Sequence, residues 1–475
     1  MVNQDFPQDI PENVINGKSD LYTFFYIRGL RLLNDKGILT FICSNSWLDV
    51  EFGAWLQKFL LERCQIYFII DNLAKRVFRE AGINTIISLI GARQKIVRAD
   101  DLVRFAAFKL PFENSLYTEN FLTIEETTNR IDFDDLRVNT VTRQTLIQEG
   151  WENSRENKYQ GSKWGGIYIK APNIYFTIID KAKDKLVKLD DIAKVSRGFT
   201  TGADEFFYIP KSNPYNIEKD FLKPVIKSPR ECKSILINPD ELGFWLFVCP
   251  YEKHELKGTN ALKYIEMGES AKKYIKQGKD KGKYIIGFQN VSSVKERRNW
   301  YDLGIRELPG LITPSSFGDN FKVYLNNGVL ANKRLYEIHY HNDLIRLALI
   351  LNSSLFFFFM ELYSSTSLGE GLLDKTVLEV ESTYIVDPMH LVPYTDIESR
   401  IDAIKYREIG SVFHELQVDP ESSSFMNANP LPDRKALDEI VFRALGLNDQ
   451  EIKAMYAGLL ELTANRIRKA KTFSN

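Results

Sequence analysis

Cysteine is scarce in this 475-residue sequence, and no two of its cysteines form a C-x-x-C pair. The four residues are Cys43, Cys64, Cys232 and Cys249. This usage is typical of a reduced intracellular protein and offers no zinc site. The sequence also lacks an apolar run long enough to span a bilayer, and its first residues do not resemble a signal peptide. We therefore expect a cytoplasmic protein that has no membrane partner.

Glycines do not gather into a nucleotide-binding turn in the first third of the chain. Gly29, Gly37 and Gly53 stand alone there, whereas a complete doubly wound sheet that binds a nucleotide carries a glycine-rich turn after its first strand. No Walker P-loop, G-x-S-x-G elbow or H-E-x-x-H motif is present either. The sequence thus excludes several common catalytic classes.

Metal-binding patterns are weak. His339 and His341 have no carboxylate or cysteine partner at ligand spacing. Pro239-Asp240 and Glu255-Leu256-Lys257 have the P-D…E-x-K order of magnesium nucleases. That order arises easily by chance in a charged chain, so we expect neither a metal site nor a nuclease.

The chain has no large excess of either charge, since its net charge is -1. Residues 151–350 nevertheless hold 33 Lys and Arg against 24 Asp and Glu. A locally basic region can neutralise phosphates whatever the total charge. A solvated lysine-rich surface explains the same count equally well.

What the sequence does contain is an alternation of helical and strand patterns over residues 19–110. Short apolar runs at 38–43, 66–70 and 85–90 predict strands, and a helix is expected at about 51–63. This rhythm predicts a doubly wound parallel sheet. The strands are too few to complete such a sheet, so we expect a partial, Rossmann-like α/β domain at residues 1–111.

Three further segments follow. Residues 112–165 are polar and irregular, which predicts a linker. Residues 166–390 mix short strands with lysine-rich connections and predict an α+β domain. Residues 391–475 are expected to be helical, with one helix at 434–445 that ends before Gly446 and a last one from Asn448 to about 470.

A family resemblance begins in the first of these segments. Residues 18–25 read KSDLYTFF, and residues 37–48 read GILTFICSNSWL. They resemble the K-x-[DN]-L-Y helix and G-x-L-x-F-I-x-x-N strand of TaqI-like adenine-N6 DNA methyltransferases and type IIG restriction–modification enzymes. Residues 77–87, VFREAGINTII, are similar to the family's V-F-x-x-x-x-V-x-[TS]-x-I segment.

In that family an aromatic residue of this last segment stacks on the flipped target base. The resemblance therefore implies that Phe78, together with Lys18, belongs to a pocket for the target adenine. The alternative is that Phe78 is an ordinary core residue, and the sequence does not separate the two.

The second half of the chain matches the same family. Residues 197–207, RGFTTGADEFF, resemble the R-G-x-x-T-G-x-[DN]-x-x-F opening of its target recognition domain. Residues 352–355, NSSL, and 368–371, LGEG, are similar to later landmarks, and residues 437–447 look like its C-terminal helices. The resemblance implies that residues 166–390 read a DNA sequence.

One departure from the family concerns chemistry. The family activates the adenine amine with an [NDS]-P-P-[YFW] loop, and this chain has no such tetrapeptide. Ser212-Asn213-Pro214-Tyr215 lacks the second proline and lies inside the recognition segment. The resemblance thus implies no catalytic residue in this chain and S-adenosylmethionine as a cofactor of the complete enzyme only. A separate N-terminal methyltransferase or nuclease half is then an expected partner, beside double-stranded DNA.

Candidate DNA contacts come from the basic central segment and from the turn at 197–202. They are Arg197, Thr200, Thr201, Lys223, Lys227, Arg230, Lys272, Lys273, Arg297, Arg298, Lys333 and Arg334. Two functions fit these expectations. The chain either forms part of an adenine-specific methyltransferase or is a stand-alone DNA-binding specificity subunit without catalysis.

Overall fold

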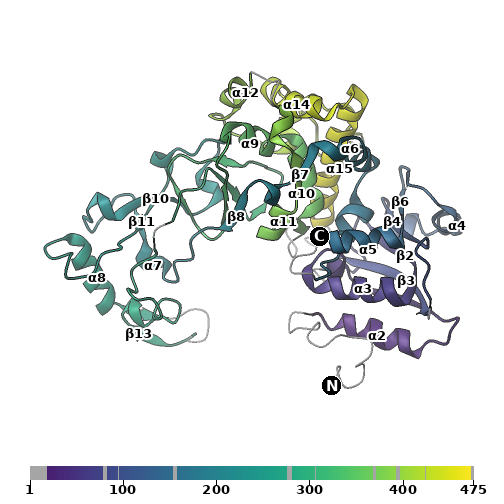
Figure 1. The fold of residues 1–475 in the computed structure, drawn as a ribbon, viewed down its shortest axis with the longest axis horizontal. Coiled ribbons are helices and arrows are strands. Elements are labelled where there is room, and N and C mark those ends of the chain that lie inside the picture. The colour runs from purple at the N-terminus through teal and green to yellow at the C-terminus, as the bar shows by residue number, and fades with distance from the viewer. Residues whose placement is uncertain are drawn as a thin grey trace.

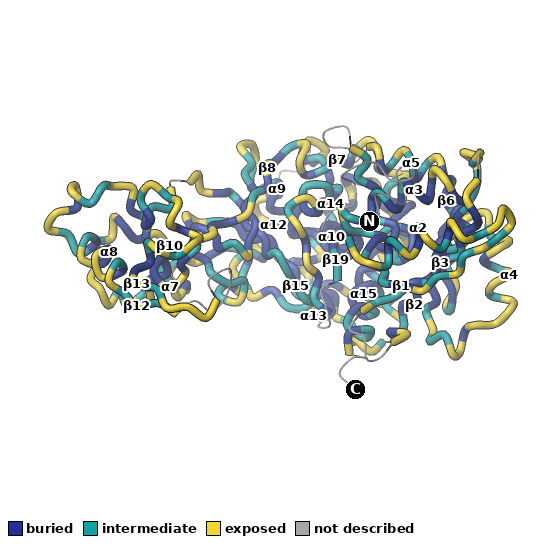
Figure 2. The backbone as a smooth tube through the Cα atoms, turned by 90° about the horizontal axis from the view of Figure 1, so that it is seen from below, coloured by how far each residue is buried: buried dark blue, intermediate teal, exposed yellow. Residues whose placement is uncertain are grey.

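The computed structural model divides into an N-terminal sheet with its helices, a helical middle and a region of small sheets, placed along the long axis of the molecule (Figure 1). The buried residues run continuously through the helical middle, as Figure 2 shows. The structure describes residues 19–78, 83–94, 96–152, 158–274, 281–304, 306–366, 371–391, 396–422 and 424–471.

The N-terminal sheet has six strands in the order β1-β3-β2-β4-β6-β5. They span Ile38–Ser44, Thr85–Arg93, Cys64–Asn72, Leu102–Phe108, Leu136–Thr142 and Ile131–Asp132. β3 lies between β1 and β2 and is antiparallel to both, while β2 and β4 are parallel. The prediction of a parallel sheet was therefore wrong, and the sheet is mixed. The described residues of the connection 73–84 form no crossover helix, so β3 returns beside β2 in the antiparallel direction.

β1 is an edge strand among the described residues, since β3 is its only partner there. Ile38 is 52% exposed and Ile42 is 47% exposed, so one face of the strand is not covered by described residues. The apolar run at 38–43 predicted burial on both faces. Among the described residues, β1 therefore has an open edge and an apolar face without cover, and the incompleteness of this sheet stays a prediction.

Residues 112–165 are not the irregular linker that their polar sequence suggested. They contribute β5 and β6, and β6 pairs with β4 from Leu136 to Thr142. They also hold α4 (Thr118–Glu126), α5 (Arg143–Glu152) and the start of a π-helix at Trp164–Lys170. Buried Arg137 and Asn139 on β6 explain the polar appearance, because both side chains bond to carbonyl groups of that π-helix, at Lys170 and Tyr168.

Two helices and an aromatic cluster cover the sheet. α2 (Tyr22–Leu32) and α3 (Ala54–Arg63) pack against its strands. Trp47 and Trp164 lie edge to face with ring centroids 5.7 Å apart, and Phe105 of β4 contacts Trp164 at 5.5 Å. These large rings bury the apolar area that stabilises this end of the molecule.

The central region, residues 166–390, contains two four-stranded sheets and three smaller ones. Their orders are β17-β10-β11-β9, β16-β14-β18-β8, β12-β13, β15-β20-β19 and β21-β7. The strands are β7 (Leu186–Lys188), β8 (Lys194–Arg197), β9 (Tyr208–Pro210), β10 (Leu222–Ile226), β11 (Phe244–Phe247), β12 (Lys272–Tyr274), β13 (Tyr284–Ile286), β14 (Leu311–Pro314), β15 (Ser316–Phe317), β16 (Tyr324–Leu325), β17 (Leu330–Ala331), β18 (Leu335–His339), β19 (Ser365–Thr366), β20 (Leu373–Asp374) and β21 (Tyr384–Val386). Helices α7 (Asp204–Phe207) and α8 (Asn260–Ser270) accompany the first sheet.

The helical middle draws on both the central region and the C-terminal part of the chain. Its helices are α6 (Asn173–Ala182), α9 (Leu344–Leu351), α10 (Ser354–Tyr363), α11 (Val377–Glu381), α12 (Ile397–Ile404), α13 (Val412–Glu415), α14 (Pro432–Leu445) and α15 (Asp449–Lys471). Within the described part of the chain, no single helix is both long and apolar enough to cross a membrane. Over the same residues, α9 and α10 together have the length and composition of a span, but they are bent by 62° where they meet.

Candidate functional site

The carboxyl ends of the parallel strands β1, β2 and β4 lie at one edge of the N-terminal sheet, the usual place for ligands in open α/β sheets. The loop between β2 and β3 starts here. Asn72 shapes its first turn, because its Oδ1 accepts hydrogen bonds from the backbone N–H groups of Ala74 (3.0 Å) and Lys75 (2.9 Å). Its Nδ2 donates to the carbonyl oxygen of Leu110 at 2.8 Å, which joins this loop to the end of β4.

Phe78 lies on this β2–β3 loop and is 47% exposed. The core alternative for Phe78 is therefore wrong. Neighbouring Arg76 is buried, its Nε lies 3.4 Å from Oδ1 of Asn84, and burial lowers the pKa of its guanidinium. Lys75 pairs with Glu113 at 2.8 Å.

A hollow of about 320 Å³ opens beside these residues. It is lined by Asn72, Lys75, Arg76, Val77, Phe112 and Glu113. Lys18, the other residue expected in a target-adenine pocket, lies outside the described residues. The edge therefore combines the exposed ring of Phe78 with a hollow whose lining includes neighbouring Val77 and the Lys75–Glu113 pair.

The described residues of this sheet do not build a cradle for S-adenosylmethionine. A Cβ on Gly29 would meet the side chain of Leu39 at 3.1 Å, and one on Gly37 would meet that of Leu33 at 2.9 Å. A Cβ on Gly53 would overlap the backbone of Trp47. These three glycines serve close packing within the protein.

The turn at residues 197–202 joins β8 to α7 and follows the family motif. A Cβ on Gly198 would lie 2.4 Å from the carbonyl oxygen of Ala331 and 2.5 Å from that of Asn332, so only glycine fits. Gly202 has a φ of +76°. Thr201 is 1% exposed, and its hydroxyl donates to Asp204. The Thr201 hydroxyl is thus used inside the turn, and a contact of Thr201 with DNA stays a prediction.

Five basic residues surround this turn, and we call them the basic cluster: Arg197, Arg297, Arg306, Lys333 and Arg334. The Arg197 Nε donates to the carbonyl oxygen of Lys333 at 2.9 Å. Arg297 donates to the carbonyl oxygen of Thr201 at 2.8 Å, and burial lowers its pKa. Arg297 thus holds the turn in shape.

Arg306 is the member of the basic cluster that sequence reasoning missed. Its Nη1 donates to the carbonyl oxygen of Arg197 at 3.0 Å, and its guanidinium lies over the ring of Phe199 at 4.6 Å. It remains 43% exposed and has buried Glu337 at 3.7 Å. Arg306 is over 100 residues from the turn in sequence, so no local pattern signals its position.

The other predicted DNA contacts are spread over the central region. Lys227 lies over the rings of Tyr208 and Phe244, and Arg298 pairs with Glu252 at 2.9 Å. On the β12–β13 hairpin, Lys272 lies over Tyr284, while Lys273 pairs with Glu205. Exposed side chains of Thr200, Lys223 and Arg230 complete the set.

The near match to the catalytic loop has a structural explanation. Asn213, in the near match to the catalytic loop, closes its own turn, because its Oδ1 accepts from the N–H of Ile217 at 3.0 Å and its Nδ2 donates to that residue's carbonyl oxygen. Tyr215 packs on Tyr264 with ring centroids 4.6 Å apart. No group of three or more His, Cys, Asp or Glu side chains among the described residues could hold a metal ion.

The NSSL landmark is also structural. The side chain of Asn352 bonds to both backbone groups of Val323, at 3.0 Å and 2.9 Å, and so joins the α9–α10 corner to the central sheet. Ser353 caps α10, and Ser354 bonds to buried Asp438 of α14 at 2.6 Å. Of the LGEG landmark, only Gly371 lies within the described residues.

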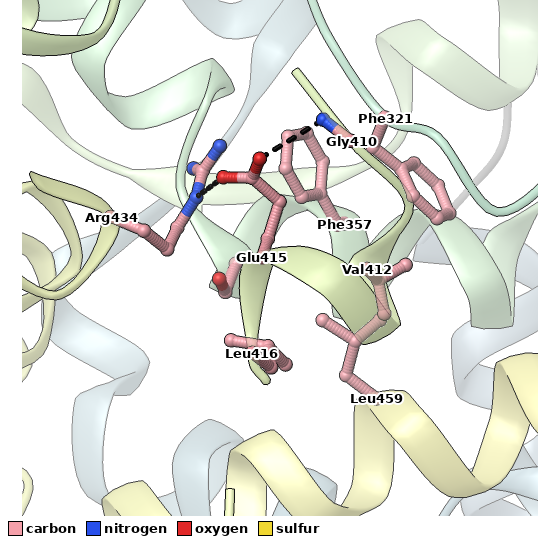
Figure 3. A pocket seen from close by; sticks show the side chains of 9 residues that line it. Phe321, Phe357, Gly410, Val412, Glu415, Leu416, Arg434 and Leu459 are labelled. Atoms are coloured by element: carbon pink, nitrogen blue, oxygen red, sulfur yellow. Dashed lines mark hydrogen bonds and ion pairs between the residues drawn. The ribbon is translucent and has the colours of Figure 1, made fainter. Parts of the chain in front are cut away.

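A small pocket lies between these helices, and Glu415 and Arg434 are among the residues that line it (Figure 3). Glu415 accepts from Arg434 at 3.2 Å and from the N–H of Gly410 at 3.0 Å. Arg407 binds both oxygens of Glu415, at 2.8 Å and 2.7 Å. These bonds outweigh the burial of the carboxylate and lower the pKa of Glu415 to about 2. The network joins α13 to α14, and its role is to stabilise the fold.

Comparison with known proteins places both halves of the chain in one class. Residues 4–78 match the family described as Eco57I restriction-modification methylase. Residues 161–414, more than half of the chain, match the C-terminal domain of the type II methyltransferase M.Eco57I. The chain belongs to this family of restriction–modification methyltransferases.

Individual relatives are more distant. The type II methyltransferase M.AccI of Acinetobacter calcoaceticus is 25% identical over 244 residues, which are 49% of this chain and 38% of that protein. The chain thus matches well under half of M.AccI. Two solved structures are similar, the type IIG restriction endonuclease BpuSI and the type IIL restriction-modification enzyme MmeI in complex with DNA. BpuSI is 13% identical with a TM-score of 0.48, covering 96% of this chain and 50% of its own. MmeI is 12% identical with a TM-score of 0.44, covering 94% and 52%.

Proposed function

We propose that this chain is the DNA-recognition part of an adenine-N6 DNA methyltransferase and receives an extruded adenine at the carboxyl edge of its N-terminal sheet. The complete enzyme would use S-adenosylmethionine, as methyltransferases of this family do. The catalytic [NDS]-P-P-[YFW] loop and the cofactor loop would come from outside this chain's described residues, and duplex DNA would be the substrate.

The exposed ring of Phe78 carries this proposal. Phe78 is 47% exposed and lies at the carboxyl edge of β2, so its ring is accessible for stacking. A flipped base is held in such sites by stacking on an aromatic face and by polar contacts to its edge. The Lys75–Glu113 pair lines the neighbouring hollow, and an entering base would compete with this pair for its polar groups.

The basic cluster supports the DNA-binding part of the proposal. Its members lie around a turn whose shape depends on Gly198, so the charges are held by backbone geometry. Arginine and lysine contacts to phosphates set the register of a protein on a duplex, and arginine also reads guanine in the major groove. Arg197, Arg334 and Thr200 are exposed and able to make such contacts.

Substitution of Phe78 tests the base-binding site. The probe is a duplex that carries 2-aminopurine opposite an abasic site, with trapping followed by fluorescence and duplex binding by anisotropy. Stacking contributes about 1–3 kcal/mol per base, so Phe78→Ala is expected to weaken trapping by about 5- to 150-fold with little change in duplex binding. The control is Phe133→Ala. Phe133 is 53% exposed and directly follows β5, which lies at the opposite edge of the sheet from β1. Equal trapping by Phe78→Ala and wild type would reject the site.

A mixing experiment distinguishes this proposal from the alternative, a specificity subunit without catalysis. The chain is incubated with S-adenosylmethionine and DNA, with and without a separately produced methyltransferase half that carries an N-P-P-Y loop. Among the described residues β1 pairs only with β3, and this favours the first function, because the free edge of a strand can pair with a further strand. Methylation only in the mixture supports it, whereas sequence-specific binding that no such half converts into methylation supports the alternative.

A further inference from the structure

Helix α15 ends at the root of the loop that carries Phe78. The Nζ of Lys469 lies 3.1 Å from Oδ1 of Asp71 and donates to the carbonyl oxygen of Asn72 at 2.5 Å. The side chain of Lys469 is only 13% exposed and that of Asp71 only 3%, and burial lowers the pKa of Lys469. Asn72 is the residue whose side chain shapes the first turn of the β2–β3 loop.

One turn earlier, Arg466 of the same helix bonds to the central region. Arg466 forms a two-pronged ion pair with Glu361 of α10, at 3.0 Å and 2.6 Å. It also donates to the carbonyl oxygen of Gly318, at 2.9 Å, and to that of Gly371. Both glycines belong to the region that we propose reads DNA.

A third contact fixes α15 on the sheet itself. Glu461 accepts from Nη2 of Arg137 at 3.0 Å, and Arg137 on β6 is 1% exposed. Side chains at positions 466 and 469 are neighbours on a helix, since residues three apart lie on one face. Within one turn, α15 therefore bonds to the central region and to the base of the β2–β3 loop.

We propose that the end of α15 is a brace that sets the position of the β2–β3 loop relative to the central region, and that Lys469 is the positioning residue. The inference rests on the proposed function, because the loop matters there as the carrier of Phe78. Binding and catalytic groups must be held to within about 0.5 Å of a productive geometry, and neighbouring contacts provide that precision. An extruded base can stack on Phe78 only if the central region holds the DNA at the matching position.

The effect of Lys469→Met on the full chain tests the brace. Hydrogen exchange of the Ala74 and Lys75 amides, which bond to Asn72, is expected to accelerate at least 10-fold, while amides of β6 keep their wild-type rates. Trapping of unpaired 2-aminopurine should weaken at least 5-fold with duplex binding changed less than 2-fold. The control is Lys471→Met, whose side chain is 66% exposed.

A second variant keeps the test decisive if Lys469→Met does not fold. Asp71→Asn preserves size and the bond from Lys469 to the Asn72 carbonyl, so a smaller acceleration of the same loop amides is expected. If the loop amides exchange at the wild-type rate in both variants, the contact does not position the loop and the brace is overturned. If the β6 amides accelerate as much as the loop amides, the contact only stabilises the whole fold, and the brace is likewise overturned. Absence of trapping by the wild-type chain rejects the proposed base site, while the exchange result still decides the brace.

Discussion

Glu415 shows how a single carboxylate organises the helical middle. Its side chain is 6% exposed and is bonded to Arg407, Arg434 and Gly410, which outweighs the cost of burying its charge. Arg434, itself 1% exposed, forms an ion pair with this carboxylate at 3.2 Å. The lowered pKa of about 2, against 4.5 in the unfolded chain, makes the contribution of Glu415 dependent on pH.

Glu415→Gln is therefore expected to lower the free energy of unfolding by about 3 kcal/mol at pH 7. The native state holds the deprotonated form, so the stabilisation is complete above pH 4.5 and is lost as the pH falls from 4.5 towards 2. Urea denaturation at several pH values measures this, and the variant should show a flatter acid dependence than wild type. Glu408→Gln is the control, because its pair with Lys233 is exposed and contributes under about 1 kcal/mol. Equal losses from the two substitutions would contradict the expectation.

At the scale of elements, the turn at 197–202 and the β17–β18 connection form one unit. Phe199 donates to the carbonyl oxygen of Ala331 at 2.7 Å, and Lys333 donates to that of Phe199 at 2.9 Å. Gly198 packs against the carbonyl groups of Ala331 and Asn332. A side chain at position 198 would push away the backbone that carries Lys333 and Arg334. The unit thus links the shape of the turn to the position of its charges.

Gly198→Ala is expected to destabilise the protein by about 1–3 kcal/mol and to weaken duplex binding. Urea denaturation and anisotropy measure the two effects at a temperature where the variant is folded. Gly243→Ala should change stability by less than about 0.5 kcal/mol, because the nearest atom to its added Cβ is 4.0 Å away. Normal duplex binding by folded Gly198→Ala would remove the turn from the proposed interface.

At the scale of the whole molecule, the two ends reach out from the helical middle, with the N-terminal sheet at one end and the central sheets at the other (Figure 1). The net charge of -1 gives no general attraction to DNA, so binding would depend on local charge such as the basic cluster. Each phosphate that the protein neutralises releases counterions and adds about -0.9 to the slope of log K against log salt.

A salt titration of duplex binding should therefore give a steep negative slope. Arg306→Gln is expected to make the slope less negative by about 0.9, with similar losses on different sequences if its contact is a phosphate. Lys58→Gln is the control, because Lys58 lies on α3 of the N-terminal sheet and pairs with Glu62 at 3.8 Å. Binding that does not respond to salt would rule out the proposed DNA interface.

Local patterns were sufficient for many elements and for the family. The apolar runs at 38–43, 66–70 and 85–90 correspond to β1, β2 and β3, and the helix expected at 434–445 is α14, closed by Gly446 with a φ of +73°. Motifs spread over both halves identified the restriction–modification methyltransferases, to which the family matches assign the chain. Such features depend on residues close in sequence, so they are readable without coordinates.

Contacts between distant residues were decided only by the tertiary structure. The antiparallel insertion of β3, the use of β6 as a strand and the burial of Thr201 all depend on what lies opposite in space. The same holds for Arg306 at the turn and for Lys469 beneath the β2–β3 loop, whose partners are 109 and 398 residues away. Strand pairing and burial are set by long-range packing, which no local spacing of residue types specifies.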